Sequence, residues 1–107
     1  MKMLYNKLVR DRIPEIIAAG GKTCVCKTLD DRMYLEALDA KLNEELAEYQ
    51  QSKSLEELAD LLEVIQAVIF ARGSTPQEVE AIRAAKAAER GGFSRRLFLV
   101  HTEMSDS

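Results

Sequence analysis

The chain has 107 residues, of which 47% are hydrophobic and 31% charged, and its formal net charge is -3. This length suits a single domain over residues 1–107, and the composition is that of a globular protein rather than a disordered or fibrous one. No apolar run reaches the roughly 20 residues that a membrane span needs, so we expect no membrane partner. The small negative charge gives no reason to expect polymeric nucleic acid.

The amino-terminal residues and the cysteines bear on the compartment. Residues 1–11 alternate charged and apolar side chains too quickly for the apolar region of a signal peptide. Cys24 and Cys26 are too few for a disulfide scaffold and suit a reducing environment. We therefore expect a cytoplasmic protein.

The charges are segregated along the chain. Residues 1–12 carry four basic side chains and one acid, net +3, and residues 83–96 carry five basic side chains and one acid, net +4. Between them, residues 36–63 carry nine acids and two lysines, net -7. An acidic centre with basic flanks suits a cation together with a polyanionic ligand. Solvated helix faces explain the same pattern without a ligand.

A short helix and a short strand are the first elements that the sequence predicts. Asp11 is a candidate cap for a helix over residues 12–19, with Pro14 in its first turn and a glycine pair after it. Residues 22–29 are rich in β-forming side chains between Gly-Gly and Asp-Asp, which predicts a strand.

A long helix follows. Asp30 or Asp31 caps it, and it runs to about Gln51, after which the polar stretch ending at Lys53 forms a turn. Its apolar side chains recur every three or four residues and form one stripe. These side chains are Leu35, Leu38, Leu42, Leu46 and Tyr49.

The next helix is predicted from Ser54 to about Arg72. Ser54 and Glu57 have the spacing of a capping box, and Gly73 ends the helix. Its second half is apolar on nearly all sides, and such a helix must be covered on all sides. A chain of this size cannot cover it alone, so we expect an oligomer, either a homodimer or a homotetramer.

The last predicted elements are a helix and a second strand. Thr75 and Pro76 begin the helix, which ends near Arg90 before two glycines. Residues 96–100 read as a short strand, which needs a partner and is expected to pair with residues 22–28. The predicted fold is therefore mainly α, an antiparallel helical bundle with a small two-stranded β element.

Four acids occupy comparable positions on the two central helices. Glu45 and Glu48 are three residues apart, as are Glu57 and Asp60, so each pair projects on one side of its helix. Helices joined by so short a turn lie antiparallel, so the pairs can converge, and Glu45 also falls on the apolar stripe. Carboxylates at a core edge repel unless a cation neutralises them, and oxygen ligands suit Mg²⁺ or Mn²⁺. Taken one at a time, each of these acids also has a structural explanation, either as a residue at a helix start or as a solvated side chain.

These motifs resemble a known superfamily. Glu44-Glu45-x-x-Glu48 followed by Glu57-x-x-Asp60 is similar to the MazG-type, all-α NTP pyrophosphohydrolases, in particular a branch like phosphoribosyl-ATP pyrophosphohydrolase. The resemblance covers nearly the whole chain to about Val100. It is also carried by residues 5–17 (Tyr-Asn-Lys-Leu-Val-Arg-Asp-Arg-Ile-Pro-Glu-Ile-Ile), by Lys41-Leu42-x-Glu44-Glu45, by Glu57-Leu58-Ala59-Asp60 and by Arg90-Gly91-Gly92-Phe93.

The resemblance implies a dimeric or tetrameric helical core and Mg²⁺-dependent hydrolysis between the α- and β-phosphates of a nucleoside triphosphate. It implies metal ligands at Glu45, Glu48, Glu57 and Asp60, with Glu44 as a further ligand or the base that orients water, so that Glu44 and Glu45 are the catalytic candidates. Only eight residues separate Glu48 from Glu57, so a tighter turn is expected to change how the second pair approaches the metal.

Basic residues on both flanks are the candidates for binding phosphates, because phosphoryl transfer depends on charge neutralisation. On the last helix Arg83, Lys86 and Arg90 follow at intervals of three and four; the second group at the amino terminus is Lys7, Arg10 and Arg12. The alternatives are a basic helix end favoured by the helix dipole and ion pairs with the surplus acids.

Two other functions compete with a general nucleotide pyrophosphohydrolase. One is phosphoribosyl-ATP pyrophosphohydrolase itself, although the helix after Asp60 lacks the Tyr-His pair associated with that enzyme. The other is a non-catalytic helical interaction module, which has no reason to keep four convergent carboxylates.

Overall fold

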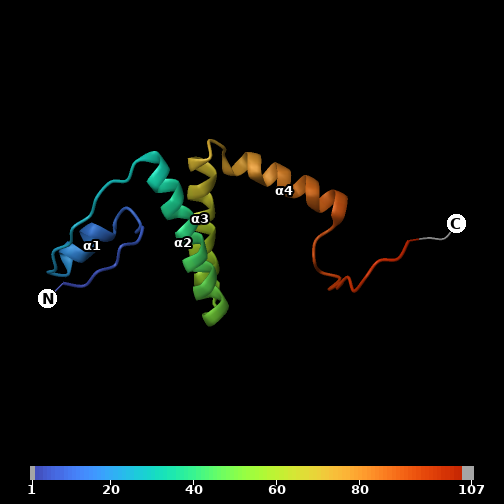
Figure 1. Cartoon of the computed structure of the whole chain (residues 1–107), viewed down its shortest axis with the longest axis horizontal. Coiled ribbons are helices and arrows are strands. Elements are labelled where there is room, and N and C mark those ends of the chain that lie inside the picture. Colours follow the sequence, from blue (N-terminus) through green and yellow to red (C-terminus); the bar gives the residue numbers. More distant parts are fainter. Residues whose placement is uncertain (1, 105–107) are drawn as a thin grey trace. The chain divides into compact units, whose positions relative to one another are not determined.

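The computed structural model describes residues 2–104 of the chain and is mainly α-helical. Four helices follow in order: α1 is Ile13–Ala19, α2 is Asp31–Ser52, α3 is Leu55–Ala71 and α4 is Pro76–Arg90 (Figure 1). The structure divides into two compact units, Met1–Thr75 and Pro76–Ser107. Within residues 2–104, no helix combines the length and the apolarity needed to cross a membrane.

Helix α2 begins as its sequence predicts. Asp30 is the N-cap, and its carboxylate accepts a hydrogen bond from the backbone N–H of Met33 at 2.8 Å. Such a bond satisfies one of the amides that the first turn of a helix leaves unpaired. Leu38, in the middle of the apolar stripe, is only 2% exposed, whereas Leu46 is 42% exposed. The stripe therefore packs closely only over part of its length.

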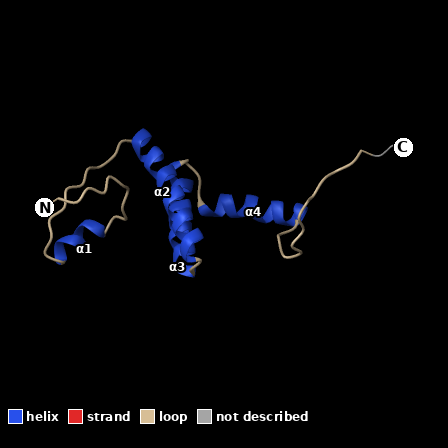
Figure 2. Ribbon diagram, turned by 60° about the horizontal axis from the view of Figure 1, so that its bottom comes forward, coloured by secondary structure: helices blue, strands red, loops and turns tan. Residues whose placement is uncertain are grey.

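The turn between α2 and α3 is shorter than predicted, because α2 continues to Ser52. Lys53 takes the left-handed conformation, with φ 59° and ψ 22°, and its N–H donates to the carbonyl of Tyr49 at 2.7 Å. Ser54 then caps α3, its hydroxyl accepting the N–H of Glu57 at 3.2 Å. This turn places α2 and α3 side by side as an antiparallel pair (Figures 1 and 2).

The apolar core of the described residues is thin. Leu38 and Val64 are its buried apolar side chains, and both belong to the α2–α3 pair. On α3, Leu62 is 65% exposed and Ile65 is 38% exposed. An amphipathic pair of helices that leaves such side chains in water has unused apolar surface.

Two predictions for the flanking segments are wrong. Helix α1 is capped at Arg12 with no side-chain hydrogen bond, so Asp11 is not its cap, although Pro14 does lie in the first turn. Residues 22–28 and 96–100 form no strand, and no strand occurs elsewhere in residues 2–104 (Figure 2). The two segments belong to different units. A two-stranded element by itself is at best marginally stable in water, so β-forming side chains alone do not make these segments strands.

Candidate metal centre

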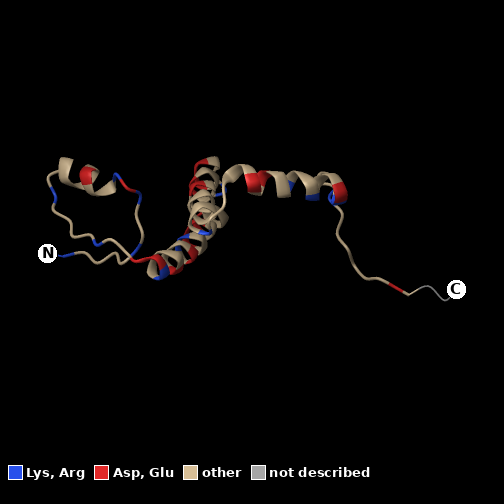
Figure 3. Cartoon of the chain, turned by 90° about the horizontal axis from the view of Figure 1, so that it is seen from above, with Lys and Arg blue, Asp and Glu red and all other residues tan. Residues whose placement is uncertain are grey.

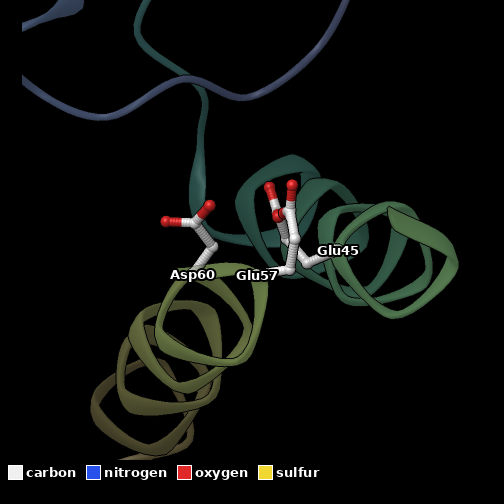
Figure 4. Close-up of side chains that lie close together, drawn as sticks. All are labelled: Glu45, Glu57 and Asp60. Carbon is white, nitrogen blue, oxygen red and sulfur yellow. The ribbon is translucent and has the colours of Figure 1, made fainter. Parts of the chain in front are cut away.

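Three of the four predicted ligands meet at the end of the α2–α3 pair near the turn. One carboxylate oxygen from each of Glu45, Glu57 and Asp60 lies within 4.8 Å of the other two. Glu45 comes from α2, and Glu57 and Asp60 come from successive turns of α3. The carboxylates of Glu45 and Glu57 lie side by side and point the same way, with Asp60 beside them (Figure 4).

Glu45 is the buried member of this carboxylate triad. It lies seven residues after Leu38, which places both side chains on one face of α2, and only 6% of the residue is exposed. Its Oε2 atom is buried with no hydrogen-bond partner, and the same holds for Oε2 of Glu57. Buried carboxylate oxygens without partners are energetically costly, and a cation would satisfy them.

Burial also raises the pKa of the Glu45 carboxyl above its ordinary value. Lys41, one turn earlier on α2, opposes this rise, since its Nζ lies 3.4 Å from Oε1 of Glu45. The nearby Glu48 carboxylate adds to it. Lys41 is thus a site residue that was not among the predicted functional residues, although its i, i+4 spacing to Glu45 is a signal in the sequence.

Glu48 is not part of the triad. It is exposed, and one turn of helix places it about 60° around α2 from Glu45. Glu44 also lies outside the triad, and its Oε1 is 3.4 Å from Nζ of both Lys7 and Lys41. The structure therefore brings together Glu45, Glu57 and Asp60 and leaves Glu44 and Glu48 at the edge of the cluster.

The amino-terminal basic residues lie against these acids. Arg10 donates from Nη2 to Oδ1 of Asp60 at 2.8 Å, and Lys7 contacts Glu44 from 37 residues away in the chain. In Figure 3 the positions of acidic residues are red along α2 and α3, and those of basic residues are blue along the amino-terminal segment. Arg10 and Lys7 thus form ion pairs with acids of the two central helices. Such ion pairs were the alternative to phosphate binding for these basic residues.

The predicted basic face of α4 forms on an exposed helix. Arg83, Lys86 and Arg90 are all exposed. Arg83 is already held by Glu80, to which it donates from Nη2 at 2.6 Å and from Nε at 2.9 Å. This pairing lowers the pKa of the Glu80 carboxyl. Lys86 and Arg90 belong to the second unit, whereas the triad belongs to the first.

The donor set of the triad fits a hard divalent cation. Carboxylate oxygens alone are the ligands of Mg²⁺ or Mn²⁺, whereas zinc sites use nitrogen or sulfur. Two buried oxygens without partners are the observation that supports a cation here rather than a solvated acidic surface. Nothing in the donor set distinguishes Mg²⁺ from Mn²⁺.

Comparison with known proteins assigns no family. No family model matches the chain, and no solved structure matches it. A stretch of 42 residues is 64% identical to part of an uncharacterized protein of Mycolicibacterium smegmatis. The match covers 39% of this chain and 43% of that protein, so it spans less than half of either.

Proposed function

We propose that the protein is a Mg²⁺-dependent nucleoside triphosphate pyrophosphohydrolase, which cleaves between the α- and β-phosphates and releases a nucleoside monophosphate and pyrophosphate. The observation that carries this proposal is the buried Glu45 carboxylate, which lies beside those of Glu57 and Asp60 and has one oxygen without a partner. A structural acid would be exposed or fully paired. The choice of this reaction rests on the motifs that resemble those of the MazG-type enzymes.

In this proposal Glu45, Glu57 and Asp60 hold the cation. A bound Mg²⁺ polarises a phosphate oxygen and lowers the pKa of an attacking water. Glu44 orients that water, and Lys7 and Lys41 hold Glu44 in place through their contacts with its Oε1. Arg10 lies beside Asp60, and its guanidinium would be the group that binds a phosphate there.

We also propose that the protein acts as a homo-oligomer. Leu62 and Ile65 lie about 200° and 140° around α3 from Asp60, so they form a separate face from the triad. Both are exposed although the chain has little other apolar core. A second copy that covers this face would bury it without blocking the metal centre. The same face would serve a non-catalytic assembly module, so the presence of activity has to be measured.

The deciding experiment is a screen of NTPs, dNTPs and phosphoribosyl-ATP with Mg²⁺, in which pyrophosphate and orthophosphate are measured separately. We expect pyrophosphate, no release with EDTA, and loss of activity in Glu45→Gln and Asp60→Asn. A strong preference for phosphoribosyl-ATP would identify the narrower enzyme. Orthophosphate as the product, or unchanged turnover in both variants, would refute the proposed reaction or its site.

A further inference from the structure

The two cysteines of the chain lie in residues 22–30, the segment that joins α1 to α2 (Figure 1). Cys24 and Cys26 are both free thiols, and both are exposed. The segment makes no turn or bend, and none of its residues has a positive φ. The two cysteines therefore belong to an extended stretch of chain that is open to solvent.

An extended chain places Cys24 and Cys26 on the same side, because side chains two residues apart point the same way. Val25, which lies between them, falls on the opposite side and is fully exposed. Desolvation and a hydrogen bond with the Cys26 side chain raise the pKa of the Cys24 thiol above its ordinary value. Cys24 and Cys26 thus form a pair of neighbouring thiols, here called the thiol pair.

The spacing of the thiol pair allows a disulfide but strains it. Two steps of an extended chain separate the Cα atoms by about 6.6 Å. Disulfides usually join Cα atoms about 4.4–6.8 Å apart, most often about 5.5–6 Å, so the segment has to contract before the bond can form. A strained and exposed disulfide is easily reduced again. This geometry suits reversible oxidation rather than a permanent cross-link.

Basic side chains flank the thiol pair. Lys22 and Lys27 are both exposed, and Lys22 precedes Cys24 by two residues, which places it on the side of the thiols. Positive side chains raise the local concentration of an anionic reagent. Glutathione disulfide is such a reagent, because its carboxylates outnumber its amino groups.

We propose that Cys24 and Cys26 are a redox site, which closes to an intramolecular disulfide by exchange with an anionic low-molecular-weight disulfide. One protein thiolate attacks a sulfur of the reagent, forms a mixed disulfide and releases one reagent thiol. The other protein thiolate then attacks the protein sulfur of that mixed disulfide and releases the second reagent thiol. The thiol pair loses two electrons and two protons, which the two released thiols carry away. No residue of the triad lies in this segment, so the proposal does not depend on the proposed function.

The test is equilibration of the full chain with mixtures of glutathione and glutathione disulfide, followed by trapping with N-ethylmaleimide and mass spectrometry. In a large excess of glutathione, both cysteines should be alkylated. In glutathione disulfide the chain should become a monomer that is lighter by two hydrogen atoms, takes up no maleimide and reopens when glutathione is added. Cys24→Ser and Cys26→Ser each leave one exposed thiol and should stop at the mixed disulfide.

Lys22→Gln tests the charge of the reagent. We expect it to slow the reaction with glutathione disulfide by roughly threefold at low salt, and to leave the reaction with the uncharged bis(2-hydroxyethyl) disulfide unchanged. Lys53→Gln removes the same charge from an exposed residue outside the segment and is the matched control. Equal slowing with both reagents would refute the choice of an anionic reagent.

Three results would overturn the redox site itself. They are no reaction with glutathione disulfide, a mixed disulfide that persists on the unmodified chain, and disulfide-linked dimers in place of the closed monomer. A disulfide that survives a large excess of glutathione would also contradict the proposal, because it would be a stable cross-link and not a reversible one.

Discussion

Glu45 carries an energetic cost in the metal-free protein. Its side chain is buried, one oxygen is contacted by Lys41, and the other has no partner. Leaving a buried acceptor unsatisfied costs about 1–3 kcal/mol. A protein keeps such a group when another role repays the cost, and binding a cation is the role that the neighbouring Glu57 and Asp60 suggest.

The raised pKa of Glu45 gives this cost a pH dependence. Between its ordinary value of 4.5 and the raised value, the folded state binds more protons than the unfolded state. The contribution of Glu45 to stability is therefore present at low pH and is lost as the pH rises through that window. Once it is ionised, the Glu45 carboxylate destabilises the metal-free fold.

We expect Glu45→Gln to raise the melting temperature of the metal-free protein at pH 7 by roughly 5 °C, since ~1 kcal/mol shifts a domain of this size by that much. The variant should also lose stability less steeply than the unmodified protein as the pH rises from 4.5 to 7. Thermal unfolding in EDTA at several pH values measures both effects. Glu36→Gln, an exposed acid on α2, is the matched control. A lower melting temperature for Glu45→Gln at pH 7 would contradict this account.

In the proposed metal centre, Arg10 would compete with the cation for the charge of Asp60. A unit charge interacts with another at 4 Å by ~1 kcal/mol even in water, and Mg²⁺ carries two. We therefore expect Arg10→Gln to tighten Mg²⁺ binding by roughly tenfold in calorimetry at low salt, while nucleotide turnover falls. Arg12→Gln removes the same charge from a residue that pairs with Glu15 in α1 and should change neither quantity. Weaker Mg²⁺ binding in Arg10→Gln would assign that residue a purely structural role.

At the scale of elements, the two-residue turn decides which acids meet. Because α2 continues to Ser52 and the left-handed Lys53 reverses the chain at once, the first turns of α3 lie against the last turns of α2. Glu45 on the inner face then meets Glu57 and Asp60, while Glu48 remains exposed.

The three basic residues on one face of α4 differ in their contacts. Arg83 is held by Glu80, whereas Lys86 and Arg90 are exposed near the carboxyl-terminal end of the helix. Basic side chains at that end are also favoured by the helix dipole, by up to about 1 kcal/mol. Kinetics and stability therefore have to be measured together on the same variants.

If Lys86 and Arg90 hold phosphates, Lys86→Glu and Arg90→Glu should each lower kcat/KM by at least about tenfold, because one charge-assisted contact contributes roughly 1.5–3 kcal/mol. The melting temperature without ligand should change little, since exposed charges contribute under about 1 kcal/mol. Lys22→Glu places the same charge change in an exposed loop and serves as the control. A loss of stability with intact kinetics would return these residues to a structural role.

At the scale of the whole molecule, the thin core is the main feature. Leu38 and Val64 are the buried apolar side chains of the described residues, while Leu62 and Ile65 on α3 lie in water. Burying apolar surface is the dominant favourable term in folding. The proposed second copy, by covering α3, would bury more of this apolar surface.

We expect Leu62→Glu to dissociate the oligomer, because it would bury a charge in the interface. Sedimentation at micromolar concentration should show a dimer or tetramer for the unmodified protein and a smaller species for the variant. Val25→Glu, at a fully exposed loop position, is the control that should keep the oligomer. A well-folded monomer of the unmodified chain would contradict the proposed assembly.

Local patterns in the sequence predicted much of this structure. The caps at Asp30 and Ser54, the antiparallel pairing of α2 and α3, and the place of Glu45 on the buried face all depend on contacts within a few residues. Helix periodicity and cap chemistry act over that same range, so they are readable without tertiary contacts. The spacing of the acids also limited the predicted metal ligands to Glu45, Glu48, Glu57 and Asp60.

The tertiary structure decided which of those candidates meet and what faces them. It grouped Glu45 with Glu57 and Asp60, brought Arg10 to Asp60 across 50 residues, and formed no strand at residues 22–28 or 96–100. Each of these outcomes depends on how distant segments approach one another. A strand or an ion pair forms only when its partner arrives, and neither partner is encoded in the residues next to it.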